Sequence, residues 1–122
     1  MFRKSIKKAN GVSVGNSATN TPVSAEAALS NSGANRGCRF EAQCSNVTAG
    51  VTLKLQCQLI DASWVDVKSV AVAANGVAVL RLHHSVSADA ALMPVAPVVR
   101  LVVTTDGTGT VDVGEVALYQ EP

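Results

Sequence analysis

Few side chains in this sequence have the types and the spacing that enzymatic chemistry requires. His83 and His84 are the only histidines, and because neighbouring residues of a strand point to opposite faces, they cannot serve one site. Asp61 and Asp66 flank Trp64 and could form an acid–base or carbohydrate site. Paired carboxylates act within a cleft, whereas these two lie on an expected hairpin, where solvated loop acids are the favoured interpretation. The pattern predicts a protein that is not an enzyme.

The remaining candidate motifs also favour structural roles. The segment Asp106–Gly109 is rich in glycine, but it follows an expected strand, opens no helix and lacks a phosphate-binding lysine, so a turn is expected. Cys38, Cys44 and Cys57 fall on the apolar phase of two expected strands, which favours buried thiols over a metal site. We therefore expect no cofactor and no bound metal. The odd number of cysteines also favours reduced thiols and assembly in a cytoplasm.

Basic residues are concentrated near the N-terminus. Residues 1–40 carry six Lys or Arg and one acid, whereas residues 41–122 carry four basic residues and eight acids. The net charge of +1 therefore hides a basic segment on a mildly acidic body. Such a segment usually contacts an acidic partner, and the expected partner-binding residues are Arg3, Lys4, Lys7, Lys8 and Arg36. So few charges would give only salt-sensitive contact with nucleic acid, and no specific nucleic-acid partner is expected.

The first 36 residues differ in composition from the rest of the chain. They hold most of the small polar and turn-forming residues and show no lasting periodicity. We expect residues 1–36 to form a flexible basic N-terminal arm on a domain over residues 37–122. An alternative is an arm that becomes ordered by lying across a neighbouring subunit. No apolar segment follows the first basic residues, and no window approaches the roughly 18 apolar residues of a membrane helix, so neither secretion nor a membrane partner is expected.

From Cys38 onward, apolar and polar residues alternate with a period of two. The clearest run covers residues 51–59, where five apolar positions face one way and four polar positions face the other. Strict alternation is typical of an antiparallel sheet with one face on a core. Further strands are expected at residues 38–45, 64–70, 77–83, 98–104 and 111–119.

Turn signals separate these expected strands. Asp61–Ser63 predicts a hairpin loop, and Asn75-Gly76 predicts a type I′ hairpin turn because both residues tolerate positive φ. Residues 85–97 contain two prolines and predict a long crossover, and Gly114 lies where the apolar phase changes, which predicts a β-bulge. Six such strands without a long helix predict an all-β fold. We expect an antiparallel β-sandwich or jelly roll of about six to eight strands, with a short closed barrel as the alternative.

The order of three segments is similar to that in small tailed-bacteriophage virion proteins. An alternating strand with Leu53–Gln58 leads through a tight turn to Trp64–Val67, and Val99–Thr104 precedes a Gly/Thr turn and a last apolar strand. Over roughly residues 38–120 this layout resembles capsid decoration (cement) proteins and other small β-sandwich virion structural proteins. The turn before the tryptophan, Asp61–Ser63, is shorter here than in that pattern.

The resemblance implies a non-enzymatic virion protein that binds the outside of a phage capsid lattice and cements neighbouring capsomers. Its partner would be the major capsid protein, its location the virion, and its assembly would take place in the host cytoplasm. We also expect a homodimer or homotrimer, because symmetric self-association is the default for such modules. Two alternatives stay open: another head–tail or tail accessory protein, and a carbohydrate-binding β-sandwich module that uses Trp64 and Tyr119.

Overall fold

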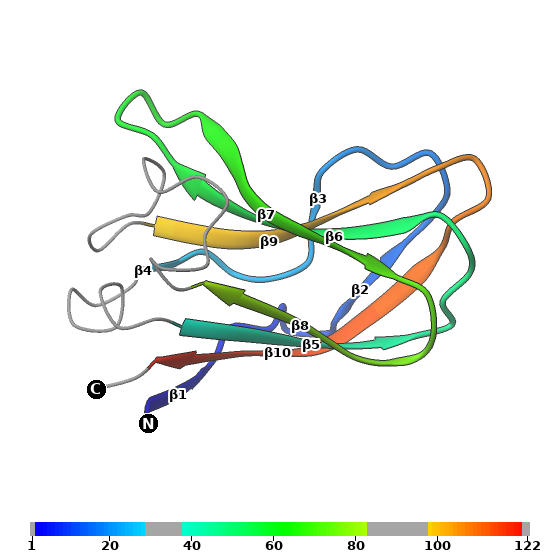
Figure 1. Ribbon diagram of the computed structural model, residues 1–122, viewed down its shortest axis with the longest axis horizontal. Coiled ribbons are helices and arrows are strands. Elements are labelled where there is room, and N and C mark those ends of the chain that lie inside the picture. Colours follow the sequence, from blue (N-terminus) through cyan, green and yellow to red (C-terminus); the bar gives the residue numbers. More distant parts are fainter. Residues whose placement is uncertain (1, 29–37, 83–97, 121–122) are drawn as a thin grey trace.

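The computed structural model describes residues 2–28, 38–82 and 98–120, all of them in strands, turns and loops. Two antiparallel sheets pack face to face as a β-sandwich, as Figure 1 shows. We name each sheet after its central strand. The β10 sheet contains β1 (Phe2–Ser5), β2 (Val12–Val14), β5 (Cys38–Ser45), β8 (Gly76–Leu82) and β10 (Val111–Gln120). The β9 sheet contains β3 (Thr21–Pro22), β4 (Ala27–Ala28), β6 (Val51–Gln58), β7 (Trp64–Val72) and β9 (Val98–Thr105).

The strand order places β10 and β5 inside one sheet and β9 and β6 inside the other, so each of these four strands pairs on both sides. In the β10 sheet the order is β1-β10-β5-β8, and β2 also pairs with β10. In the β9 sheet the order is β3-β9-β6-β7, and β4 also pairs with β9. The predicted antiparallel sandwich is therefore confirmed. The described residues form ten strands rather than six to eight, because four short strands precede β5.

Those four short strands correct the prediction of a flexible N-terminal arm. Phe2 pairs with Gln120 in an antiparallel ladder, so the start of the chain lies beside its last strand (Figure 1). β2 continues along the same side of β10, and β3 and β4 pair with β9. Within residues 2–28 the arm prediction is wrong, because backbone pairing along β10 and β9 holds this segment in the two sheets.

A few apolar side chains fix the N-terminal segment to the core. Ile6, Val14, Val23 and Ala27 are all buried, although the residues between them are mostly small and polar. Strands of two to four residues are too short to show a period in the sequence, which explains why composition alone suggested disorder. The proposed domain boundary between residues 36 and 37 lies outside the described residues.

The apolar side chains of the alternating pattern fill the space between the two sheets. Along β5 and the first half of β6, every second side chain is buried and the intervening ones are more exposed. Burying a large aliphatic side chain contributes about 1.5–3 kcal/mol, so this layer supplies most of the driving force for folding. The largest fully buried side chains come from both sheets: Phe40, Leu80 and Leu118 from the β10 sheet, and Leu53, Leu55 and Leu101 from the β9 sheet.

The Asn75-Gly76 sequence does not form the predicted hairpin turn. It joins β7 to β8, and these strands belong to different sheets, so the connection crosses the sandwich. Asn75 Oδ1 accepts a hydrogen bond from the Val47 amide at 2.9 Å, which ties this connection to the neighbouring one between β5 and β6. The local turn preference is overridden because β8 buries its apolar face by pairing with β5. The hairpin predicted around Asp61–Ser63 does form, between β6 and β7.

The β-bulge predicted at Gly114 is confirmed. The pairing of β10 with β5 shifts register between Val113 and Val116. Both valines are buried even though they lie on opposite phases of the sequence alternation. The bulge therefore lets one long strand keep its apolar side chains on the core along its whole length.

The three buried thiols give a first prediction. Burial raises the pKa of the Cys38 thiol from 9.0 to about 12 and also raises the pKa values of Cys44 and Cys57. A folded-state pKa above the unfolded value stabilises the fold fully below pH 9, and that contribution is lost as the pH rises towards 12. The urea midpoint should therefore fall across this interval, and less steeply in Cys38→Ala. Rapid reaction of all three thiols with a maleimide in the native protein at neutral pH would contradict their burial.

Gly50 gives a second prediction about stability. Its φ is +87°, and a Cβ atom added there would overlap the carboxylate of Asp106. Gly50→Ala should lower the free energy of unfolding by about 1–3 kcal/mol in urea denaturation, because of backbone strain and the displaced carboxylate. Gly107→Ala is the control, since a Cβ atom there meets no atom within 4 Å. Equal losses in the two variants would show that the Gly50 geometry is not required.

Candidate interaction surface

A row of cationic and aromatic side chains crosses the outer face of the β10 sheet. Cross-strand pairing sets Arg3 beside Tyr119, Tyr119 beside Arg39, and Arg39 beside Arg81. These four residues come from β1, β10, β5 and β8, so the row spans the sheet. The adjacent residue Leu118 is fully buried, and successive side chains of a strand alternate between faces, so the row faces outward. We call Arg3, Tyr119, Arg39 and Arg81 the arginine row.

The tyrosine ring organises the arginine row. The Arg39 guanidinium lies 4.5 Å from the centroid of the Tyr119 ring, and the Arg3 guanidinium lies 5.9 Å from it. Arg3 Nε also donates a hydrogen bond to the Tyr119 hydroxyl at 3.2 Å. Cation–π contacts of this kind contribute about 0.5–1 kcal/mol at exposed sites. The ring therefore holds two like charges close together on the outer face of the sheet.

Two glutamates neutralise part of this positive charge. Arg39 Nε lies 2.8 Å from Glu41 Oε2, without the alignment of a hydrogen bond, so the contact is an ion pair. Glu115 lies 3.9 Å from both Arg3 and Lys7, and its Oε1 accepts a hydrogen bond from Ser5 Oγ at 2.6 Å. These exposed pairs contribute little stability. The four cations Arg3, Lys7, Arg39 and Arg81 outnumber these two glutamates, and they still outnumber the acids when Asp112 near the start of β10 is included, so the outer face keeps a net positive charge.

The structure divides the basic residues predicted to bind a partner. Arg3 and Lys7 reach this outer face, where both lie within ion-pair distance of Glu115. Lys4 is paired with core-facing Leu118, so alternation turns it away from the arginine row. Lys8 is exposed in the turn that follows, and its carbonyl accepts the amide hydrogen of Gly11. Arg36 lies outside the described residues.

Sequence reasoning missed three members of this surface: Tyr119, Arg39 and Arg81. Arg39 and Tyr119 occupy the polar phase of predicted strands, so their outward orientation could have been read from the alternation, whereas Arg81 shares its phase with Val77 and Val79 and gave no such signal. Their proximity could not, because it depends on β10 and β8 pairing with β5, and these strands are far apart in the sequence. No short segment of the sequence indicates that a tyrosine lies between arginines of two neighbouring strands.

The outer face of the β9 sheet carries a different polar network. Gln56 is only 3% exposed, its Nε2 donates to Asp66 Oδ1 at 2.8 Å, and its Oε1 accepts from Arg100 Nε at 3.0 Å. Lys54 Nζ lies 3.4 Å from Asp66 Oδ2, and the Arg100 guanidinium lies 4.1 Å from the Trp64 ring centroid. Each of these polar groups has a partner within the sheet, so the network stabilises β6, β7 and β9 against one another.

This arrangement separates the two aromatic residues considered for a carbohydrate platform. Trp64 lies on the outer face of the β9 sheet, whereas Tyr119 lies on the outer face of the β10 sheet. The two rings are therefore on opposite sides of the sandwich and cannot contact the same sugar chain. The Arg100 guanidinium also occupies one face of the indole. The structure thus contradicts a shared binding platform.

The aspartates near Trp64 also have separate structural partners. Asp61 Oδ1 accepts hydrogen bonds from the Ser63 amide at 3.0 Å and from Ser63 Oγ at 2.5 Å, which lowers the pKa of its carboxyl. Asp66 belongs instead to the network with Gln56 and Lys54. A carboxylate held ionised within a loop is a poor general acid. His83 and His84 lie outside the described residues.

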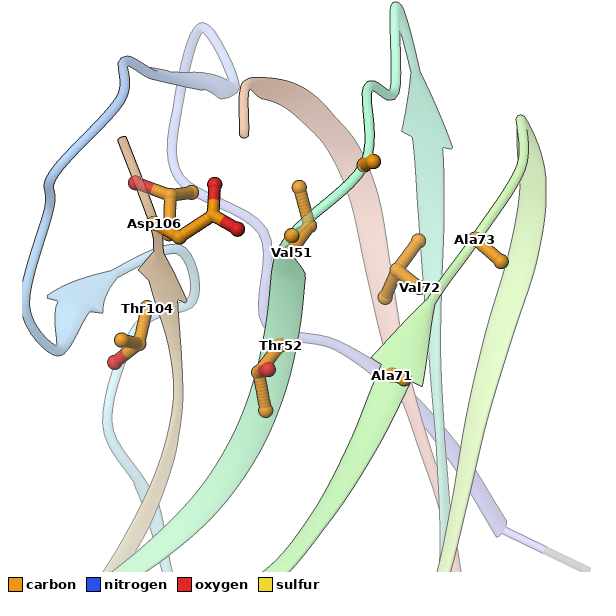
Figure 2. A pocket seen from close by; sticks show the side chains of 10 residues that line it. Val51, Thr52, Ala71, Val72, Ala73, Thr104 and Asp106 are labelled. Carbon is orange, nitrogen blue, oxygen red and sulfur yellow. The ribbon is translucent and has the colours of Figure 1, made fainter. Parts of the chain in front are cut away.

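A shallow hollow of about 460 Å³ opens where β6 begins and where β7 and β9 end (Figure 2). Small side chains such as Ala71 and Ala73 form one side, and Asp106 lies on the other (Figure 2). Asp106 Oδ1 accepts hydrogen bonds from the amides of Thr108 and Gly109, both at 2.8 Å, and these bonds lower its pKa. Among the described residues that line the hollow, it is the one titratable group, so no acid–base pair is formed there.

Residues 2–28, 38–82 and 98–120 contain no group of three His, Cys, Asp or Glu side chains arranged to hold a metal ion. Nor do these ranges include a helix with the length and apolar character needed to cross a membrane.

Comparison with known proteins shows a likeness of fold. No protein family and no characterised protein matches the sequence. The N-terminal CBM22-1–GH10 part of the Clostridium thermocellum endo-1,4-β-D-xylanase 10B, solved with xylohexaose, matches 99% of this chain with a TM-score of 0.51 and 15% identity. The chain covers only 25% of that protein. At this identity the likeness supports the β-sandwich fold alone.

Two viral structures match more distantly. Those of infectious bursal disease virus, strains Gt and Gx, cover 96% of the chain with TM-scores of 0.36 and 0.37 and identities of 13% and 12%. This chain covers 29% of each.

The buried network of the β9 sheet gives a third prediction. Gln56→Ala removes the bridge between Asp66 and Arg100, and should lower the free energy of unfolding by about 1–3 kcal/mol because partly buried polar groups lose their partner. Gln58→Ala is the matched control, because that side chain makes only an exposed 3.3 Å bond to the Ala62 carbonyl. Urea denaturation followed by the fluorescence of Trp64, the single tryptophan, measures both. Similar losses for both variants would argue against the network.

Proposed function

We propose that this protein is a non-enzymatic virion structural protein that binds the outside of a phage capsid lattice through the outer face of its β10 sheet. The observation that carries the proposal is the arginine row, which places Arg3 and Arg39 against Tyr119 and Arg81 beside Arg39 on one face of the sheet. Arginine and tyrosine are enriched at protein interfaces and dominate binding energy there. The resemblance of residues 38–120 to capsid decoration proteins supplies the kind of partner.

The chemistry of the surface specifies an acidic patch on the partner. The guanidinium groups of the arginine row can each form bidentate hydrogen bonds with a carboxylate, and Tyr119 adds apolar contact area. On a shell, the same contact is repeated at every lattice position, so modest affinity at one site suffices for stable decoration. The major capsid protein is the partner that we propose, in the virion, after assembly in the host cytoplasm.

A head–tail or tail accessory role is the main alternative. The same basic face would serve either role, and the number of copies in purified particles separates them. A cement protein is present in numbers comparable with the capsid protein, whereas a tail component is present in a few copies or about a dozen.

Neighbouring basic residues allow a matched test of this proposal, which is our fourth prediction. Arg3→Ala with Lys7→Ala removes two charges that reach the outer face of the β10 sheet, whereas Lys4→Ala with Lys8→Ala removes one charge turned away from the arginine row and one from the turn that follows β1. The first pair should weaken cosedimentation with undecorated shells about tenfold, and more at low salt than at high salt. The second pair should bind nearly as well as the wild type.

Two results would contradict the proposal. Equal loss in both double variants would indicate that overall N-terminal charge, rather than the face of the β10 sheet, attracts the partner. Failure of the wild-type protein to bind shells at all would rule out the cement role. Circular dichroism of each variant confirms that the sandwich is intact before binding is compared.

A further inference from the structure

An open β-sandwich has four exposed strand edges, and three of those seen here are protected against pairing with another chain. The edge of the β10 sheet formed by β1 and β2 is interrupted between them, and so is the edge of the β9 sheet formed by β3 and β4. β3 also ends in Pro22, which has no amide hydrogen to donate. β7 contains a register shift against β6 and carries Asp66 and Lys68. Breaks, prolines, bulges and charges are the usual protections of an edge.

The fourth edge, β8, has few of these protections. It pairs with β5 in continuous register from Gly76 to Leu82, without a bulge, a proline or a lysine. In the part of the chain that the structure describes, no strand pairs with its other side. Val77 is 59% exposed and Val79 is 39% exposed, both on the outer face of the sheet. Exposed valines on a strand that is paired on one side only favour the addition of another strand.

The backbone of β8 identifies which groups are free to pair. Lys68 Nζ donates to the Arg81 carbonyl at 2.7 Å, so this carbonyl points away from β5, towards β7 at the open side of the sandwich. In an antiparallel ladder, alternate residues direct both polar backbone groups to the same side. Val77 and Val79 therefore direct their amide and carbonyl groups towards the free edge, while Lys68 covers the end at Arg81. A hollow of about 410 Å³ beside them, lined by small residues that include Ala73, Ala74 and Ala78, leaves room along the edge.

We propose that β8 pairs antiparallel with β8 of a second copy of this chain, about a two-fold axis at Ala78. In this register Val77 lies opposite Val79 of the second copy, and Val79 lies opposite its Val77. Each pair exchanges both backbone hydrogen bonds, and the four valines form one apolar cluster. The contact is isologous, so it closes at a dimer.

Charge favours a second copy in this orientation. Arg81 is the one charged residue of β8, and a parallel arrangement in register would place it beside Arg81 of the second copy. The antiparallel arrangement sets the two arginines at opposite ends of the paired strands. Pairing of the two β8 strands also joins the β10 sheets of the two copies into one continuous sheet, and each half of that sheet carries its own arginine row. The proposal does not rest on the proposed function, because pairing needs only the free edge.

Sedimentation velocity of the pure protein over a range of concentrations is the test of association, and it forms our fifth prediction. The wild type should approach the dimer value as concentration rises. Val79→Lys should remain monomeric throughout, because it places a charge in the centre of the valine cluster. Ala71→Lys adds the same charge to an exposed position of the β7 edge and should associate like the wild type. A monomeric wild type, or unchanged association of Val79→Lys, would overturn the proposal.

Cross-linking tests the register independently. Residues at a two-fold axis in a non-hydrogen-bonded pair are close enough for a disulfide, so Ala78→Cys should form a covalent dimer under mild oxidation. Ala74→Cys is the control, because it is exposed in the connection between β7 and β8 but away from the axis. We expect at least tenfold faster cross-linking of the first variant. Equal rates would indicate random collision, and dimers cross-linked only through Ala74→Cys would contradict this register.

Discussion

The pairing of β10 with three other strands is the interaction on which the rest of the structure depends. β10 holds β1 and β2 on one side and β5 on the other, so it joins the beginning of the chain to its end. The bulge near Gly114 allows this, because both halves of the strand can then direct their apolar side chains into the core. Without β10, the arginine row would lose Tyr119 and also the strand that carries Arg3.

The outer faces of the two sheets have different roles. One phase of each strand fills the core, and the other phase is free to carry polar chemistry. On the β9 sheet, the polar groups of Gln56, Asp66 and Arg100 form hydrogen bonds with one another, so this face stabilises the sheet. On the β10 sheet, positive charge exceeds negative charge around Tyr119, so this face keeps capacity for a partner. The surface that we propose for shell binding is thus the one whose charges are left partly unpaired.

Much of the central fold could be predicted from alternation, because burial on one face gives each long strand a local signature. The runs at residues 38–45, 51–58 and 98–105 match their predicted strands to within one residue. The N-terminal strands left no such signature, because they are short and owe their position to partners near residues 100 and 117. The Asn75-Gly76 turn and the arginine row were missed for a related reason: each depends on which distant strand is the neighbour, and local sequence does not record that.

Hydrogen exchange at single amides of the free protein tests the central claim most directly, namely that the N-terminal segment completes the β10 sheet. The account predicts that some backbone amides of β1 and β2 are protected about as strongly as those of β10, because β1 and β2 form their ladder hydrogen bonds with β10. Exchange at the rate of an unstructured peptide throughout residues 2–14, with β10 and β5 still protected, would contradict it. The segment would then be a free tail, and the arginine row would not include Arg3.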